Sequence, residues 1–224
     1  MMSFTIVIPV LNEAANLPRL AAQLGPLAQR SVEIVIVDGG SADDTVRLAE
    51  QAGFRVIRSA RGRAAQMNAG AARSTGDVLI FLHADTELPP DALPRIAAHL
   101  DSGYEWGRFD VTIVGTPVML RVVATMMNWR SRLTGIATGD QAIFMTRDAY
   151  DAVGGFPDQP LMEDIEISRR LRSRSRPACL GSRVATSGRR WESRGVWRTI
   201  FLMWRLRWAY WRGRPARELA EAYR

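Results

Sequence analysis

The sequence predicts an α/β protein built on a doubly wound, mostly parallel sheet, and three features of the chain support this fold class. Apolar runs rich in β-branched residues recur through the first hundred residues, helical patterns separate them, and acidic residues follow them. Runs that are apolar throughout are typical of strands buried on both faces, and the helices between such strands supply right-handed crossovers. The predicted strands are 4–10, 32–37, 54–59 and 77–82, and the predicted helices between them are 14–24, 43–52 and 64–73.

The second half of the chain has a looser pattern. Its predicted elements are a helix over 88–100, a strand over 108–115, a helix over 118–132 and a strand over 142–146. No internal repeat or low-complexity linker marks a firm domain boundary. We therefore expect one domain over residues 1–186, with residues 187–224 as a basic, tryptophan-rich, amphipathic helical extension of that domain.

Composition limits the class of protein. The chain has 224 residues, of which 47% are hydrophobic, enough for a sizeable core. A net charge of +7 favours anionic partners such as phosphate-bearing ligands, nucleic acid or an acidic membrane surface. The single cysteine, Cys179, excludes an intramolecular disulfide and a cysteine-based zinc site. Because we expect neither a signal sequence nor a membrane-spanning stretch, the protein is predicted to be cytoplasmic.

Acidic residues follow three of the predicted strands: Glu13, Asp38 and Asp85. The carboxyl ends of parallel strands meet at one edge of a sheet, where open α/β proteins bind their ligands. Carboxylates gathered there repel one another unless a cation lies between them or each binds a separate donor group. A divalent metal carrying a diphosphate would suit both the acidic edge and the basic protein. The alternative is that each motif is an ordinary solvated turn, since Asp, Asn and Gly dominate turns.

Four motifs together resemble glycosyltransferase family 2. They are IVIPVLNEAANL, EIVIVDGGSADDT, GRAAQMNAGAARSTGDVLIFLHADT and GGFPDQPLMEDIEISRRLR, and they span about residues 3–175 in the order typical of that family. The resemblance implies a GT-A fold for residues 1–186 and an inverting transfer of a sugar from a nucleotide-sugar donor to an acceptor hydroxyl. It also implies a divalent metal, Mn²⁺ or Mg²⁺, and a carboxylate as the catalytic base.

The resemblance also assigns roles to individual residues. Asp38 matches the carboxylate that hydrogen-bonds the nucleotide base, and residues 83–85 match the DxD motif, whose last aspartate, Asp85, binds the metal. His83 stands in place of the first aspartate, where a neutral imidazole can hydrogen-bond a ribose hydroxyl or ligate Mn²⁺ without adding negative charge. A purely structural histidine is the alternative. Leu11 stands where an aromatic residue that stacks on the base is common, so the identity of the base is left open.

Two further residues complete the predicted donor site. Arg63 lies at a predicted helix N-terminus, where guanidinium and backbone N–H groups suit a diphosphate, although solvated surface arginines are the alternative. Asp140 precedes a strand, where it can hydrogen-bond the donor sugar or the acceptor. The predicted donor-binding residues are Pro9, Asn12, Glu13, Asp38, Gly39, Arg63, His83, Ala84 and Asp140, and the predicted metal ligands are Asp85 and His83.

The catalytic base is expected among the acidic residues of MEDIE. Glu163 and Asp164 are adjacent, so on a helix their side chains diverge by about 100° and cannot act together on one proton. The residue pattern alone does not separate Asp164 from Glu163 or Glu166, and the resemblance selects Asp164. The alternative is that these acids only cap a helix and offset the arginines that follow them.

Residues 194–212 hold four of the seven tryptophans. In helical projection these tryptophans and Ile200 fall within an arc of about 80°, and arginines flank them. Such a face suits the headgroup region of an anionic membrane, which would hold the protein at the inner face of the membrane near a lipid-linked acceptor. Packing of this face on the catalytic domain is an equal alternative. The aromatic residues of the face are Trp197, Trp204, Trp208 and Trp211.

Two other functions are weighed against sugar transfer. A sugar-nucleotide nucleotidyltransferase could use a similar sheet, but it would need a glycine-rich phosphate loop near the first strand, which PVLNEAANL lacks. A basic module that binds membranes or nucleic acid without catalysis would mix basic and aromatic residues along the whole chain. Here this mixing is concentrated in the tail, so no nucleic-acid partner is expected. The motif SGRRW resembles the QxxRW motif of processive family members, but Ser187 replaces the glutamine, which argues against polymer synthesis.

Overall fold

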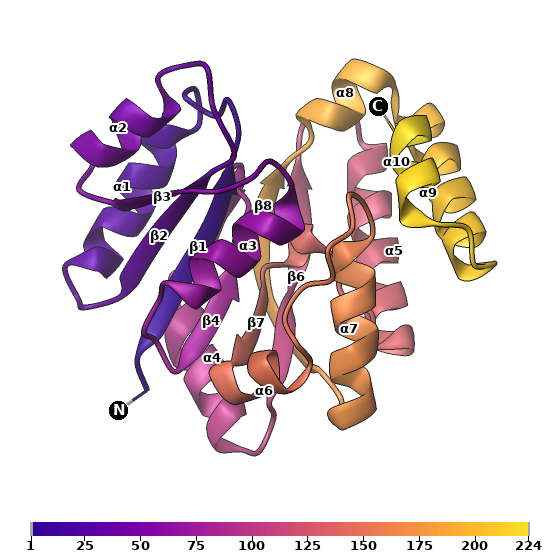
Figure 1. Ribbon diagram of the computed structural model, residues 1–224. Coiled ribbons are helices and arrows are strands. Elements are labelled where there is room, and N and C mark those ends of the chain that lie inside the picture. The colour runs from indigo at the N-terminus through magenta and orange to yellow at the C-terminus, as the bar shows by residue number, and fades with distance from the viewer. Residues whose placement is uncertain (1, 224) are drawn as a thin grey trace.

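The computed structural model describes residues 2–223 and contains an eight-stranded sheet (Figure 1). Its strands are β1 (Phe4–Val10), β2 (Glu33–Asp38), β3 (Arg55–Arg58), β4 (Val78–Phe81), β5 (Thr86–Glu87), β6 (Trp106–Val114), β7 (Ile143–Thr146) and β8 (Ala178–Ser187). Their order across the sheet is β3-β2-β1-β4-β7-β6-β8-β5. The pairs β3–β2, β2–β1, β1–β4 and β6–β8 are parallel, and β4–β7, β7–β6 and β8–β5 are antiparallel. The predicted α/β class is confirmed, and the second half of the sheet is mixed.

Helices cover both faces of the sheet, as the doubly wound prediction requires. They are α1 (Leu17–Ala28), α2 (Thr45–Gln51), α3 (Arg63–Ala72), α4 (Ala92–Asp101), α5 (Met119–Thr134), α6 (Arg147–Ala152), α7 (Glu163–Arg174), α8 (Arg189–Arg194), α9 (Val196–Trp211) and α10 (Ala216–Tyr223), with a 3₁₀ turn η1 (Gly139–Gln141). Apolar residues of α1, α2, α4 and α5 share one core with Ile6 and Ile8, while those of α3, α6 and α7 share another with Val7 and Val35. Successive strand residues point to opposite faces, so an unbroken apolar run supplies both cores.

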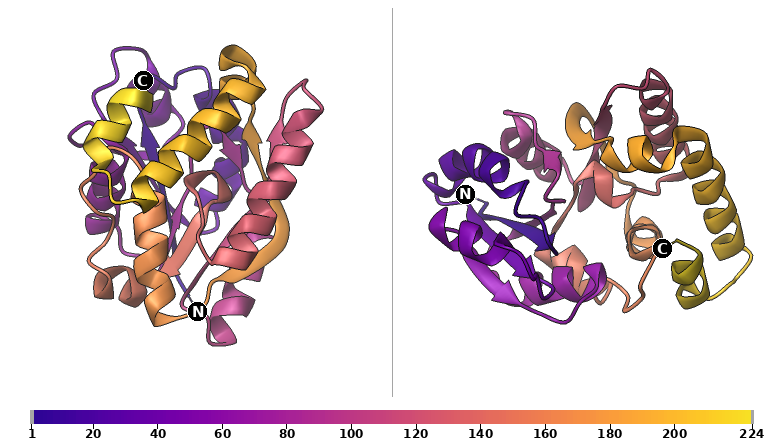
Figure 2. Two further views of the ribbon diagram at one scale, coloured as in Figure 1. Left: turned by 90° about the vertical axis from the view of Figure 1, so that its right-hand side faces the viewer. Right: turned by 90° about the horizontal axis from the view of Figure 1, so that it is seen from above.

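The C-terminal helices form a third packed region. Leu206 of α9 and Leu219 of α10 pack with Leu161 and Met162, which precede α7. Figure 2 shows α9 running beside α5 on the same side of the molecule. Gly195, with φ +82°, separates α8 from α9. The helix expected over 194–212 therefore begins two residues later than predicted, at Val196, and Arg194 belongs to α8. The division of the chain into a catalytic domain over residues 1–186 and an extension over residues 187–224 stays a prediction.

The tryptophan face of α9 points away from the core. The four predicted tryptophans are 60–80% exposed, so the alternative in which they pack on the catalytic domain is wrong. Ile200, which the helical projection grouped with them, is instead partly buried against the main core, and Phe201 joins the exposed face. Helix α5 carries a second exposed apolar stripe beside it: Val118, Val122, Met126, Trp129 and Leu133.

The close approach of α3 to the sheet depends on Gly70. A Cβ atom there would overlap the Cγ1 methyl of Val7 and come within 2.9 Å of Cγ2 of Val37. Gly70→Ala is therefore expected to lower the free energy of unfolding by about 1–3 kcal/mol, the usual cost of overpacking. Gly181→Ala in β8 is the matched control, because nothing lies within 4 Å of a Cβ atom there. Urea denaturation compares the two variants, and an unchanged midpoint for Gly70→Ala would contradict this packing.

Candidate active site

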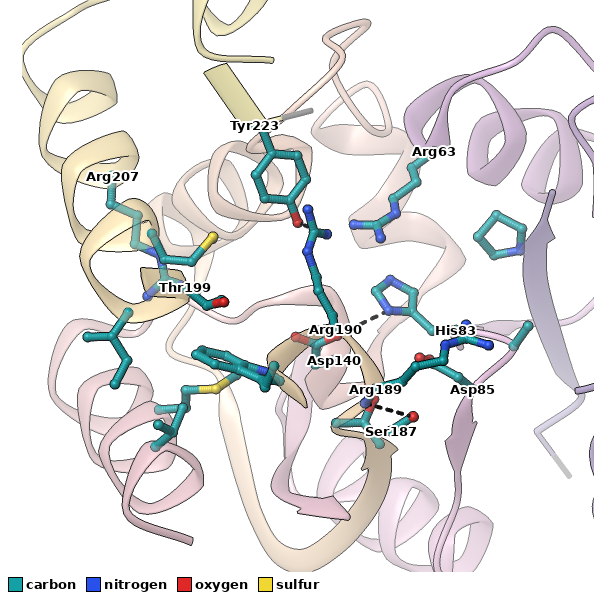
Figure 3. A pocket seen from close by; sticks show the side chains of 18 of the residues that line it. Arg63, His83, Asp85, Asp140, Ser187, Arg189, Arg190, Thr199, Arg207 and Tyr223 are labelled. Atoms are coloured by element: carbon teal, nitrogen blue, oxygen red, sulfur yellow. Dashed lines mark hydrogen bonds and ion pairs between the residues drawn. The ribbon is translucent and has the colours of Figure 1, made fainter. Parts of the chain in front are cut away.

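A cavity of about 910 Å³ opens at the carboxyl ends of β1, β4 and β8. Its walls come from this edge of the sheet, from the start of α3, and from α5 and α9. Figure 3 shows Arg63, His83 and Asp85 on one side of the cavity, Arg207 of α9 on the opposite side, and Asp140 between them. We call the part lined by the strand ends and α3 the sheet end, and the part lined by α5 and α9 the helical end.

Most of the predicted site residues come together at the sheet end. The cavity is lined there by Pro9, Glu13, Arg63, His83, Ala84, Asp85 and Asp140. The other predicted residues, Asn12, Asp38, Gly39 and Asp164, are outside its lining as the structure describes it over residues 2–223. The roles assigned to all of these residues stay predictions.

Asp38 and Asn12 shape the loops beside the cavity. The two carboxylate oxygens of Asp38, which is 3% exposed, accept hydrogen bonds from the backbone N–H groups of Gly40 at 3.1 Å and Ser41 at 3.0 Å. Asn12 Oδ1 accepts one from the backbone N–H of Ala42 at 2.8 Å. The Asn12 bond joins the loop after β1 to the loop after β2, and the Asp38 bonds close the turn that begins the second loop, so the two loops form one wall next to the sheet end.

A buried amide fixes the two strand ends behind that wall. Gln66 Nε2 donates hydrogen bonds to the backbone oxygens of Val10 and Val37, at 2.8 Å and 2.7 Å. A Cβ atom at Gly39 would lie 3.0 Å from Gln66 Oε1, so the loop passes this close to the amide only because residue 39 is glycine. The edge of the sheet is therefore rigid where a ligand would meet it.

His83 and Asp140 form a pair at the centre of the cavity. His83 Nδ1 lies 3.3 Å from Asp140 Oδ1. Burial would raise the pKa of Asp140, but the hydrogen bond from His83 and the charges of His83 and Arg63 outweigh it and lower that pKa. A Cβ atom at Gly139 would lie 2.5 Å from His83 Nε2, so the imidazole packs directly against the backbone of η1. The ring therefore has one orientation, set by Asp140 and Gly139.

The residues at the sheet end fit a divalent cation that takes most of its ligands from a bound donor. The Asp85 carboxylate accepts one hydrogen bond, from Thr86 Oγ1 at 3.4 Å, which leaves its oxygens capacity for a cation. Across residues 2–223, no three His, Cys, Asp or Glu side chains gather where they could hold a metal. Mg²⁺ in particular is commonly bound by one or two carboxylates together with substrate phosphates and water. The Asp85 carboxylate meets that requirement, whereas His83, whose Nδ1 lies against Asp140, stays a predicted ligand.

The acidic pair at the start of α7 diverges as expected. Asp164 Oδ2 accepts a hydrogen bond from the backbone N–H of Gly139 at 3.0 Å, and Oδ1 accepts one from the N–H of Ile165 at 2.8 Å. This contact joins α7 to η1 and places Asp164 beside the turn that carries Asp140. Glu163 is 5% exposed, and burial together with the charge of Asp164 raises its pKa.

Glu163→Gln is expected to stabilise the protein at neutral pH. A raised pKa means that the folded state holds the proton more tightly than the unfolded chain, so stability is lost as pH rises above the ordinary value of 4.5. The variant removes that loss, worth about 1.4 kcal/mol for each unit by which the pKa is raised. Its melting temperature should exceed that of the wild type at pH 7 and match it near pH 4. A variant that is less stable at both pH values would contradict this account.

The cavity residues that the sequence did not predict include three arginines and a tyrosine: Arg130, Arg190, Arg207 and Tyr223. The guanidinium group of Arg190 lies 3.8 Å above the ring of Tyr223 and donates a hydrogen bond to its hydroxyl. Arg130 of α5 and Arg207 of α9 line the helical end. Arg190 lies within SGRRW, which gave one signal for it. Arg207 and Tyr223 reach the cavity because the tail folds back over the sheet edge, whereas Arg130 reaches it from α5.

Comparisons with known proteins place this site in context. The profile of the family described as glycosyl transferase family 2 matches residues 5–154. An undecaprenyl-phosphate 4-deoxy-4-formamido-L-arabinose transferase from Pseudomonas savastanoi is 33% identical over 144 residues, covering 59% of this chain and 41% of that protein. The Klebsiella pneumoniae enzyme of the same name is 34% identical over 159 residues, covering 61% of this chain and 45% of its own. The chain thus spans less than half the length of these curated relatives.

Solved structures show the same fold at low sequence identity. Glucosyl-3-phosphoglycerate synthase from Mycobacterium tuberculosis, in complex with Mn²⁺, UDP and glucosyl-3-phosphoglycerate, superposes with a TM-score of 0.62 at 20% identity, covering 83% of this chain and 72% of that one. TarS of S. aureus with UDP-GlcNAc gives a TM-score of 0.65 at 17% identity, covering 83% and 58%. The GT-A fold expected from the sequence is confirmed by these structures.

Proposed function

The chain belongs to glycosyl transferase family 2, and on that premise we propose that this glycosyltransferase moves a sugar from a nucleotide-sugar donor to a hydroxyl of a lipid-linked acceptor. The family assignment excludes the two alternatives considered from the sequence, a sugar-nucleotide nucleotidyltransferase and a binding module without catalysis. The observation that carries the proposal is the continuity of the cavity. Its sheet end offers charged groups suited to a nucleotide diphosphate, and its helical end offers apolar walls suited to a lipid.

In the proposed mechanism the acceptor oxygen attacks the anomeric carbon from the face opposite the leaving diphosphate, which inverts the configuration there. Asp164 takes the proton from the acceptor hydroxyl as the new bond forms and the bond to the diphosphate breaks. Arg63 would bind the diphosphate, since the carboxylates of Glu163, Asp140 and Asp164 raise its pKa despite burial and keep it charged. A Mn²⁺ or Mg²⁺ ion bound by Asp85 and His83 would supply positive charge that stabilises the leaving diphosphate.

A second acceptor chemistry is favoured by the names of the relatives, which act on undecaprenyl phosphate. In that case a phosphate oxygen of the lipid, rather than a hydroxyl, attacks the sugar. A phosphate monoester loses its second proton at about pH 6, so its oxygen is already anionic at neutral pH and needs no base. The two candidates therefore differ in how strongly turnover depends on Asp164.

Donor binding tests the proposal. The intact chain is heated with a panel of nucleotide-sugars, with and without Mn²⁺ or Mg²⁺, and the melting temperature is recorded. A donor at a hundred times its dissociation constant should add about 2.7 kcal/mol to the free energy of unfolding. We expect one or a few donors to raise the melting temperature, and to do so more strongly with metal. If no nucleotide-sugar shifts it under any condition, the proposed function is wrong.

We also propose that the protein works at the cytoplasmic face of an anionic membrane. None of the helices described over residues 2–223 is long and apolar enough to cross a bilayer. The exposed stripes of α5 and α9 instead offer apolar side chains that could enter the interface while the helices lie flat. Flanking arginines would add about 1 kcal/mol each at an anionic surface.

Binding to liposomes is expected to require these stripes and anionic lipid. Trp204→Ala/Trp208→Ala should weaken binding about tenfold or more, since each aromatic side chain can bury on the order of 150–250 Å². Both indoles are at least 60% exposed, so the variant should fold normally. Tyr104→Ala is the control, because it removes an exposed aromatic side chain from the loop after α4, outside both stripes, and should leave binding unchanged. Binding that is indifferent to lipid charge, salt and the tryptophans would contradict the proposed surface.

A further inference from the structure

The helical end of the cavity is a groove between two helices. Its apolar walls are Met119, Val122 and Met126 on α5 and Trp197, Met203 and Trp204 on α9. Four of these side chains belong to the exposed stripes and are 51–63% exposed, so the groove opens onto the same surface that carries the stripes: Val122, Met126, Trp197 and Trp204. Its inner end is continuous with the region around Asp140. A chain lying in the groove could therefore run from the exposed surface to the reacting groups.

Two arginines face this groove from opposite helices. Arg130 Nε and Nη2, and Arg207 Nε, are shielded from solvent and have no hydrogen-bond partner among residues 2–223. Neither residue takes part in an ion pair among those described between residues 2 and 223. Burial, followed by the charge of Arg207, lowers the pKa of Arg130 to about 10, and burial also lowers the pKa of Arg207.

Such an arrangement is costly without a ligand. A cation removed from water and left unpaired loses its hydration without recovering it, and a second cation nearby adds repulsion. Arg108, which is fully buried, differs in its charge pairing: its Nε also lacks a hydrogen-bond partner among residues 2–223, but Asp110 pairs with its Nη1. The nearest acids that act on Arg207 are Asp164 and Asp140, and both lie on the reacting side of the groove. An anion between Arg130 and Arg207 would satisfy both guanidinium groups.

We propose that Arg130 and Arg207 bind a phosphate group of the acceptor lipid, whose apolar chain leaves the protein through the groove between α5 and α9. The inference rests on the proposed function and names the part of the acceptor that this chain recognises. A lipid-linked hydroxyl acceptor and a lipid phosphate both carry phosphate next to an apolar chain, so the assignment holds for either acceptor chemistry. The donor diphosphate has its own cation, Arg63, at the opposite end of the cavity.

Binding of dodecyl phosphate below its micellar concentration tests this assignment, with the fluorescence of the groove tryptophans as the readout. Dodecyl phosphate should bind more tightly than inorganic phosphate or dodecyl maltoside, which lack the chain or the charge. Arg130→Gln and Arg207→Gln should each weaken binding about tenfold to a hundredfold, the usual effect of losing a hydrogen bond to a charged group. Arg121→Gln, which removes an exposed charge from α5, should leave it unchanged.

The unliganded variants supply an independent readout. Because neither Arg130 nor Arg207 has an ion-pair partner in the part of the chain that the structure describes, each glutamine variant should melt at the same temperature as the wild type or above it. A marked loss of stability would show a structural role and overturn the proposal. Equal dodecyl phosphate binding by the wild type and both variants would also overturn it, as would inorganic phosphate binding as tightly as the alkyl ester. If nucleotide-sugars bind and dodecyl phosphate does not, this inference fails while the proposed function stands.

Discussion

Asp164→Asn is expected to lower turnover of a hydroxyl acceptor by about a hundredfold to ten-thousandfold, the contribution typical of a general base. The substitution keeps the size of the side chain and removes its capacity to take a proton. The amide oxygen can still accept the hydrogen bond that Gly139 N–H donates to Oδ2, so the contact between α7 and η1 should survive. Donor affinity should change little, because the loss falls on the transition state rather than on binding. Steady-state kinetics and donor titration measure the two quantities separately.

Glu163→Gln is the matched control for this experiment, since it neutralises the neighbouring carboxylate. It should retain most of the activity, because Asp164 and not Glu163 accepts the hydrogen bond from Gly139 in the turn that carries Asp140. Near wild-type turnover for Asp164→Asn would contradict its assignment as the base. If turnover of that variant survives above pH 6 with a lipid phosphate as acceptor, the attacking group is a phosphate oxygen.

Asp85→Ala is expected to abolish the metal-dependent part of donor affinity. Its carboxylate accepts a single long hydrogen bond from Thr86, so the fold should tolerate the loss. Removing one charged contact to the bound cation should weaken donor binding in the presence of Mn²⁺ or Mg²⁺ by about tenfold to a hundredfold. Affinity measured without metal should be unchanged, and isothermal titration in both conditions separates the two.

Two further variants serve as comparisons for the donor affinity of Asp85→Ala. His83→Ala should have a smaller effect, because a neutral imidazole contributes a hydrogen bond or a secondary ligand without charge. Asp101→Ala, which removes an exposed carboxylate at the end of α4, should have none. Wild-type affinity and metal dependence in Asp85→Ala would mean that the cation is held elsewhere.

Local pattern was enough to predict the first half of the fold. The strands β1 to β4 appear within a residue or two of their predicted positions. For β1, β2 and β4 the reason is an apolar run that is buried on both faces of a covered sheet, whereas β3 begins and ends with an exposed arginine. Helix boundaries were less accurate: the helix expected over 14–24 runs from Leu17 to Ala28. Strand β8 was not predicted. It carries Gly181 and Arg183, and its register with β6 shifts after Phe109, so neither alternation nor an apolar run marks it.

Some residues of the candidate site could likewise be predicted from the sequence, and others could not. Residues placed at strand ends, such as His83 and Asp85, were predictable because the topology of a parallel sheet brings strand ends together. Arg130, which enters the cavity from α5, was not. Nor were Arg207 and Tyr223, because they reach the cavity through packing of α9 and α10 against the start of α7. That contact joins residues more than forty positions apart, around Leu161 and Leu206, and no local pattern encodes it.

Transfer of labelled sugar into a lipid tests the central claim most directly. The intact chain is incubated with the labelled nucleotide-sugar found in the donor screen, a divalent metal and a lipid extract supplemented with undecaprenyl phosphate, and the mixture is then partitioned between water and organic solvent. The account predicts that label enters the organic phase with the wild type and with Arg121→Gln, and much more slowly with Asp85→Ala or Arg207→Gln. Label that remains in the water phase, as intact donor or free sugar, while the same donor binds the protein, would contradict transfer to a lipid-linked acceptor.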